Sequence, residues 1–107
     1  MSEVFLKIYT EENRRHHGRL LYEWLLEEAH AMGIPGGSAF RAIAGYGRHG
    51  VLHEETFFEL AGDLPVEVGF VTSEADAERL LDRIAAEGLS LFYAMLPARQ
   101  GVTGDHR

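Results

Sequence analysis

The hydrophobic residues of the chain follow the period of a β-strand in four places. Residues 4–9 (VFLKIY) carry an aliphatic side chain at every second position, which is the spacing of one strand face. Residues 38–44 and 66–71 predict a second and a third strand, and residues 89–96 predict the last one. A turn at residues 34–37 (IPGG) separates the second strand from what precedes it.

Two further segments repeat their apolar residues every three or four positions, as one face of an amphipathic helix does. The first spans residues 21–32 and stops at Gly33, since glycine readily takes the left-handed conformation that ends a helix. The second starts after Ser73, a good N-cap, with Asp76 three residues on in the manner of a capping box. Gly88 ends it.

The connecting segments are more polar. Residues 10–19 form a polar stretch, and residues 45–55 form a loop rich in glycine and histidine. Residues 55–60 predict a short helical turn or an irregular extension. The polar, glycine-containing end of the chain, residues 98–107, predicts a flexible tail.

The element order is βαββαβ, which predicts an α+β, ferredoxin-like sandwich: a four-stranded antiparallel sheet with two helices on one face. A chain of 107 residues suffices for one domain, which we place at residues 1–97. The helix-free face of such a sheet is normally polar. Here Phe5 and Tyr9 lie on that side, and the last strand is apolar on both sides. We therefore expect another copy of the chain to cover this face.

The charge, the cysteine content and the missing motifs argue against several classes of function. Seventeen acidic residues against ten basic ones give a formal net charge of −7, which argues against a nucleic-acid or anionic-membrane partner. The absence of cysteine excludes disulfides, thiol catalysis and cysteine-ligated metal centres. Because the sequence has neither a membrane-spanning apolar run nor a signal-peptide pattern at its start, we expect a cytoplasmic protein without membrane insertion. No nucleophile elbow or Walker A loop occurs, and we expect no enzyme.

The segment Gly45-Tyr46-Gly47-Arg48 is the first candidate for ligand binding. Its two glycines let the backbone turn and expose N–H groups to an anion. Arg48 adds a guanidinium that suits phosphate or carboxylate. A plain flexible hairpin connection gives the same pattern, so both interpretations stay open.

Histidines form the second candidate group. His16 and His17 are adjacent, and His49 and His53 are four residues apart, a spacing that on a helix lets two imidazoles share a metal ion. His49 lies in a glycine-rich segment, however, and no HExxH pattern occurs. Solvated or hydrogen-bonded histidines are therefore the simpler interpretation, and we predict no metal site.

Four motifs in a fixed order resemble a known family. They are residues 18–22 (GRLLY), 33–38 (GIPGGS), 41–47 (RAIAGYG) and 63–65 (DLP), the last ahead of a strand. With this series the chain resembles the PII signalling superfamily, and more closely its PII-like family catalogued as domain of unknown function 190, from Val4 to about Leu96. The resemblance implies a homotrimer of ferredoxin-like subunits whose sheets face inward.

The resemblance also implies a ligand site. In PII proteins the loop after the second strand docks on target proteins, and its base helps hold an adenine nucleotide between subunits. The implied ligand-binding residues are Gly45, Tyr46, Gly47 and Arg48, with Ser38 and Arg41 from the preceding strand. The implied docking residues in the loop are His49, Val51, Leu52, His53 and Phe57.

Two departures from the PII pattern bear on this site. Residues 36–45 hold one residue more than in classical PII proteins, which turns Ser38 to the other side of its strand unless a bulge absorbs the insertion. The loop after the second helix is only Glu87-Gly88-Leu89, so the Gly/Lys-rich phosphate loop of PII is absent.

Residues and resemblance together predict a non-catalytic signalling protein. It would bind a small metabolite, an adenine nucleotide by resemblance, in a cleft between subunits. Through the loop after its second strand it would regulate a target such as a transporter, channel or enzyme. The alternative is a small ferredoxin-like metal-binding protein or enzyme that uses the loop histidines.

Overall fold

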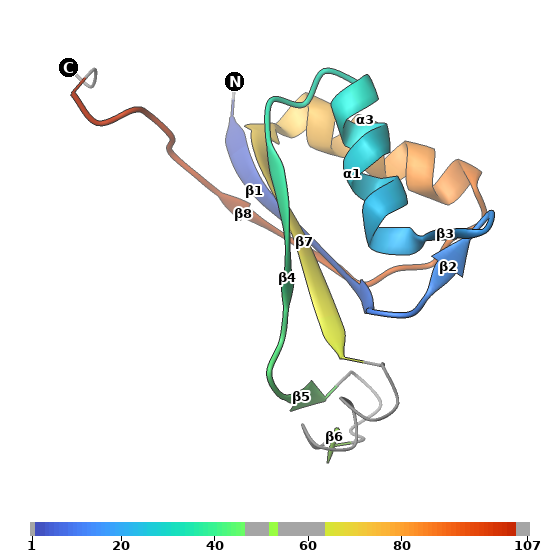
Figure 1. Ribbon diagram of the computed structural model, residues 1–107. Helices are drawn as coiled ribbons and strands as arrows, with labels where there is room; N and C mark the ends of the chain where they lie inside the picture. Colours follow the sequence, from blue (N-terminus) through green and yellow to red (C-terminus); the bar gives the residue numbers. More distant parts are fainter. Residues whose placement is uncertain (1, 47–51, 54–63, 105–107) are drawn as a thin grey trace.

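A four-stranded sheet forms one layer of the molecule. The computed structural model describes residues 2–46, 52–53 and 64–104. The strands of the sheet are β4 (Gly37–Arg41), β7 (Pro65–Ser73), β1 (Glu3–Glu11) and β8 (Tyr93–Pro97), in that spatial order. Each neighbouring pair is antiparallel. Figure 1 shows both long helices on the same side of this sheet, so the predicted α+β, ferredoxin-like fold is confirmed.

The two helices begin and end close to where the sequence predicts. Helix α1 (Leu21–Ala31) is followed by Gly33 (φ 87°), and helix α3 (Glu74–Ala86) is followed by Gly88 (φ 76°). In both, the N–H two residues beyond the C-cap returns to a carbonyl of the final turn, the Schellman motif. Ser73 caps α3 by accepting the Asp76 N–H at 3.1 Å.

The core lies between the helices and one face of the sheet. Strand pairing puts Leu6 opposite Phe70 and Ile8 opposite Val68, all on the helix side. The buried cluster joins both central strands to both helices and consists of Val4, Leu6, Ile8, Leu21, Trp24, Leu25, Ala29, Ile34, Val66, Val68, Phe70, Ala77, Leu80 and Ile84. Within the described residues, neither helix has the length and apolarity needed to cross a membrane.

Two strands are shorter than the sequence predicts. The second ends at Arg41 instead of residue 44, after which a single bond from the Ala42 N–H to the Pro65 carbonyl (2.8 Å) continues the pairing. The last begins at Tyr93 instead of Leu89. The reason is that Leu89 and Leu91 leave the helix end and pack against the core beside α3 before the chain reaches the sheet.

Two short strand pairs occur in segments that the sequence assigned to loops. Strands β2 (Arg15–His16) and β3 (Arg19–Leu20) form a hairpin within the polar stretch. Strands β5 (Gly45–Tyr46) and β6 (Leu52–His53) pair beyond the end of β4 and extend away from the main sheet (Figure 1). The turn predicted at residues 55–60 lies outside the described residues.

The chain stays attached to the sheet just past β8. The Ala98 N–H bonds to the Glu3 carbonyl at 3.0 Å, and the Gln100 amide contacts the Glu3 carboxylate. Beyond this point the described chain runs away from the sheet and both helices (Figure 1). Flexibility of residues 98–107 stays a prediction.

Candidate functional site

Strand β4 carries two of the sequence-predicted ligand residues and is one of the two edge strands of the main sheet. Gly37 starts this strand opposite Phe70, and a Cβ atom there would lie only 2.5 Å from the Phe70 ring. The absent side chain thus lets β4 pair with β7 while the Phe70 ring fills the core beneath it. The local sequence thereby fixes where Ser38 and Arg41 stand along the edge.

The pairing register puts Ser38 and Arg41 on opposite sides of the sheet. Ser38 is opposite Gly69 and shares the helix-free face, whereas Arg41 is opposite Val66 on the helix side. Both residues are exposed. Within one subunit they therefore do not converge on a point above either face, although both border the same free edge.

Arg41 is engaged by a carboxylate at the end of β1. Its Nε atom lies 3.2 Å from Oε2 of Glu12, and the Glu12 N–H is fixed by a 2.8 Å bond to the Leu64 carbonyl. An exposed pair of this kind contributes at most about 1 kcal/mol. An anionic ligand at this edge can therefore compete with Glu12 for the guanidinium.

The loop base continues the same edge. Gly45 pairs with His53 and Tyr46 with Leu52, which makes residues 45–46 part of a β-ribbon rather than a plain loop. Gly45 is half-buried near Pro65. The remaining predicted site residues, Gly47, Arg48, His49, Val51 and Phe57, lie outside the described residues.

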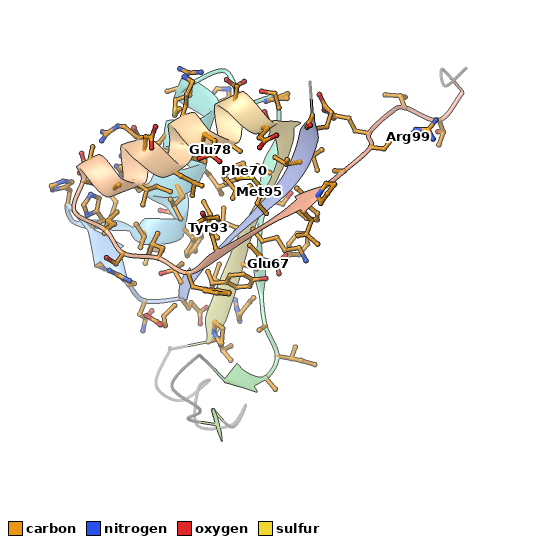
Figure 2. All side chains as sticks on the ribbon, turned by 180° about the vertical axis from the view of Figure 1, so that it is seen from behind. Glu67, Phe70, Glu78, Tyr93, Met95 and Arg99 are labelled. Atoms are coloured by element: carbon orange, nitrogen blue, oxygen red, sulfur yellow. The ribbon has the colours of Figure 1, made fainter. Side chains whose placement is uncertain are left out.

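The helix-free face of the sheet exposes apolar side chains next to this edge. We define it as the open face: the outward residues Phe5, Lys7, Tyr9, Ser38, Phe40, Glu67, Gly69, Val71, Phe92, Ala94 and Leu96. Phe40 is 63% exposed, Phe92 48% and Leu96 43%. Figure 2 labels Glu67 away from the helices and Phe70, on the same strand, toward them.

Packing on the open face is ordered. The Phe5 ring lies so close over Gly69 that a Cβ there would be 2.8 Å from it, and the Tyr9 and Phe92 rings have centroids 5.5 Å apart. Lys7 pairs with Glu67 at 3.9 Å and sits 5.0 Å from the Phe5 ring centroid. Burial, and next the negative charge and hydrogen bonding of Glu67, raise the pKa of Tyr9 above its ordinary 10.0. The charged groups of this face and the Tyr9 hydroxyl thus already have partners.

One cluster of titratable side chains was missed by sequence reasoning. His16 and His17 both contact the carboxylate of Glu87, at 2.8 and 3.0 Å. The adjacent histidines were visible in the sequence, but their partner is 70 residues away. The local hint at Glu87 was its place four residues after Arg83, which binds its other oxygen at 2.7 Å.

Arg83 and both histidines hold Glu87 in its ionised form. The hydrogen bond from Arg83, followed by those from His16 and His17, lowers the pKa of Glu87 to about 2. The other histidine pair is not comparable: His49 and the side chain of His53 lie outside the described residues.

Comparison with solved structures supports the fold. A candidate PII-like signalling protein from Thermus thermophilus superposes with a TM-score of 0.58 at 18% identity, over 92% of this chain and 90% of that one. CPII from Thiomonas intermedia K12, a structure bound to ADP and bicarbonate, gives 0.56 at 20% identity over 92% and 89%. A second CPII structure, described as a nitrogen regulatory PII-like protein bound to ADP, AMP and bicarbonate, gives 0.58 at 20% identity over the same shares.

Two relatives found by sequence have a higher identity to this chain than these solved structures do. A UPF0166 protein from Aquifex aeolicus is 38% identical over 84 residues, which are 78% of this chain and 80% of the relative. A UPF0166 protein from Methanocaldococcus jannaschii is 34% identical over 79 residues, 74% of this chain and 72% of that one. The model of the DUF190 family, described as "Uncharacterized ACR, COG1993", matches residues 3–90. Together with the PII-like fold, these matches confirm the resemblance found in the motifs: the chain belongs to the DUF190 family.

Proposed function

We propose that this protein is a non-catalytic, trimeric PII-like regulator. It binds a small anionic metabolite, an adenine nucleotide, in a cleft between subunits at the edge of β4. Ligand binding orders the loop that follows β4, and this changes how a target protein fits. The single observation that carries the proposal is the open face, because it supplies a reason for the subunits to assemble around the ligand-binding edge.

A second copy is the occupant that best fits the open face. Antiparallel sheets with one solvated face normally carry polar residues there, whereas this face exposes Phe40, Phe92 and Leu96. Its charges, Lys7 and Glu67, neutralise each other within the subunit, which lowers the cost of burying them. An apolar surface with few charged groups is typical of interfaces between identical subunits.

The ligand site follows from the edge position of β4. A ligand lying along the free edge can reach Ser38 on one side and Arg41 on the other, although the two do not converge above a single face. In an assembly through the open face, Ser38 is the residue of this pair that turns toward the neighbouring subunit. Two solved structures with this fold, both of CPII, hold ADP, which supports a nucleotide as the ligand.

An anionic ligand needs positively charged groups at its site, because the protein as a whole is negatively charged. Three chains of formal charge −7 give about −21, which repels an anion at long range. Arg48 and Arg41, with the backbone N–H groups of residues 45–47, are the groups proposed to overcome this repulsion. The docking role falls to the loop residues His49, Val51, Leu52, His53 and Phe57.

Isothermal titration with ATP, ADP, AMP and cyclic nucleotides tests the ligand, and light scattering tests the assembly. We expect a mass of about 36 kDa, three chains of 12.0 kDa, and binding of at least one nucleotide. Arg48→Ala should weaken that binding by about 10- to 100-fold, the worth of a charge-assisted hydrogen bond. Arg79→Ala, which removes an exposed arginine paired with Asp76 on α3, is the matched control and should leave it unchanged. No heat with any nucleotide refutes the nucleotide, and a monomeric mass refutes the cleft.

A further inference from the structure

Two histidines and a glutamate from distant parts of the chain meet at one end of the helical layer. His16 and His17 belong to the β2–β3 hairpin, and Glu87 is the C-cap of α3. The Nε2 atoms of the two rings lie 2.8 and 3.0 Å from the same carboxylate oxygen, Oε1 of Glu87. Within the described residues, this is the group of three ligand-type side chains whose donor atoms all lie within 4.8 Å of one another.

The backbone of the hairpin is shaped so that both imidazoles point the same way. Consecutive residues of an extended strand would direct their side chains to opposite sides. His17 instead has φ 53° and Gly18 has φ 78°, so these two residues form the left-handed turn that joins β2 to β3. A histidine with positive φ is uncommon and costs conformational energy. This unusual conformation turns His17 toward Glu87 beside His16.

Surrounding side chains fix the orientation of the cluster. The His16 ring packs edge-on against Trp24, with centroids 4.9 Å apart, and side-chain exposure at His16 is only 12%. Arg83 binds the second oxygen of Glu87 at 2.7 Å and is itself anchored to Glu28 at 3.0 Å. Metal sites have this kind of outer layer, in which hydrogen bonds and packing hold the ligands in place.

We propose that His16, His17 and Glu87 bind a divalent transition-metal ion of the zinc type, which joins the β2–β3 hairpin to the end of α3. Imidazole nitrogens and a carboxylate oxygen are ligands that such ions prefer, and two histidines with one carboxylate leave the fourth tetrahedral position open for water or an external ligand. This site lies apart from the edge of β4, so it does not rest on the proposed nucleotide function.

The two contacts that the histidines make with Glu87 need little change to accept the ion. A tetrahedral zinc with bonds of about 2.0–2.1 Å holds its ligands about 3.4 Å apart, so the contacts to Oε1 must open by about half an ångström. His17, whose side chain is 70% exposed, is free to make that adjustment. The ion replaces two N–H···O bonds, and each histidine then carries its proton on Nδ1. Because Arg83 occupies only the other oxygen, Oε1 stays available for the metal.

Zinc titration of metal-stripped full-length protein tests the proposal. We expect one Zn²⁺ per chain by isothermal titration. The variants His17→Asn and Glu87→Gln should each weaken binding by at least about a hundredfold, since even loss of a supporting contact costs 10- to 100-fold. Asparagine is chosen at position 17 because it tolerates positive φ, so the hairpin is kept while the imidazole is removed.

Matched controls separate this site from other histidines and carboxylates. His30→Ala and Glu78→Gln change exposed residues of α1 and α3 and should leave Zn²⁺ affinity unchanged. The double variant His49→Ala/His53→Ala tests the loop histidines and should also bind normally. If this double variant abolishes binding while His17→Asn retains it, or if the unmodified protein binds no Zn²⁺, the proposal is wrong.

A second measurement keeps the test valid if a variant folds poorly. Zn²⁺ should raise the thermal midpoint of the unmodified protein, and a chelator should reverse the rise. In His17→Asn the midpoint without metal should stay near that of the unmodified protein, and Zn²⁺ should not shift it. An equal shift in both proteins contradicts coordination by His17. Neither readout depends on nucleotide binding, so the two proposals fail independently.

Discussion

The two faces of the same sheet differ in how much apolar surface they leave exposed. On the covered face Leu6, Ile8 and Val68 have no exposed surface, because the helices pack directly over them. On the open face Phe40, in one edge strand, and Phe92, beside the other edge, are 63% and 48% exposed. Burial within one chain thus stabilises the subunit, whereas the apolar surface left over is available to a second chain.

The two faces also differ in the polar residues that they contain. The described buried polar residues, Thr10 and Thr72, both belong to the covered face and carry no charge. The open face carries the Lys7–Glu67 pair and the Tyr9 hydroxyl beside it. Charges that are already paired can be covered at lower cost than free ones. We therefore expect substitutions on the covered face to change subunit stability, and substitutions on the open face to change the proposed assembly.

The largest expected effect is on the covered face. Phe70→Ala removes a large buried ring that packs over Gly37 and into the core, and should lower the free energy of unfolding by about 3–5 kcal/mol. Urea denaturation at one fixed protein concentration measures this loss, since assembly makes stability depend on concentration. Phe92→Ala, the same change at a 48% exposed position, is the control. A loss as large at Phe92 as at Phe70 would contradict the difference between the faces.

An intermediate effect is expected on the open face. Leu96→Ser removes an apolar contact from the proposed interface and should weaken association by about 1 kcal/mol per interface, because Leu96 is 43% exposed and association buries only that remaining surface. Light scattering over a dilution series should show dissociation at higher concentration than for the unmodified protein, with the subunit still folded. Val102→Ser is the control, because Val102 is exposed beyond the end of β8. Equal dissociation of both variants would place the interface elsewhere.

The sequence predicted the buried positions of the covered face better than the lengths of the edge strands. Alternation at Val4, Leu6 and Ile8 and the caps at Ser73 and Gly88 are local signals, and each is confirmed. Strand lengths were less accurate, since the packing of residues 89–91 on α3 is a tertiary effect that no strand period contains.

The candidate sites also divide into features that the local sequence predicts and features that depend on tertiary packing. Ser38 lies on the helix-free side of β4, because its register with Gly69 determines the parity that the one-residue insertion had left open. The roles of residues 45–48 rest on the resemblance and stay predictions. The meeting of His16 and His17 with Glu87 could not be predicted, because it depends on a left-handed turn and on the packing of a hairpin against a helix 70 residues away.

The smallest expected effect is a shift in the pKa of Tyr9. Because this side chain lies on the open face, its titration reports directly on whether that face is covered. Burial and the Glu67 carboxylate raise the pKa of this phenol, so folding favours its neutral form. The resulting stabilisation is present below the ordinary pKa of 10.0 and is lost as pH rises through the raised value. Phenolate absorbance of the unmodified protein minus that of Tyr9→Phe isolates this group from the other tyrosines, of which the chain has four in all.

If the subunits associate through the open face, the pKa of Tyr9 should rise further. A second subunit would remove more water from Tyr9, so its pKa in the assembled protein should exceed that in the dissociated Leu96→Ser variant. Glu67→Gln should lower the pKa in both states, because it removes the negative charge but not the burial. A Tyr9 pKa that is the same in assembled and dissociated protein would mean that water still reaches this face, and that the subunits meet through another surface.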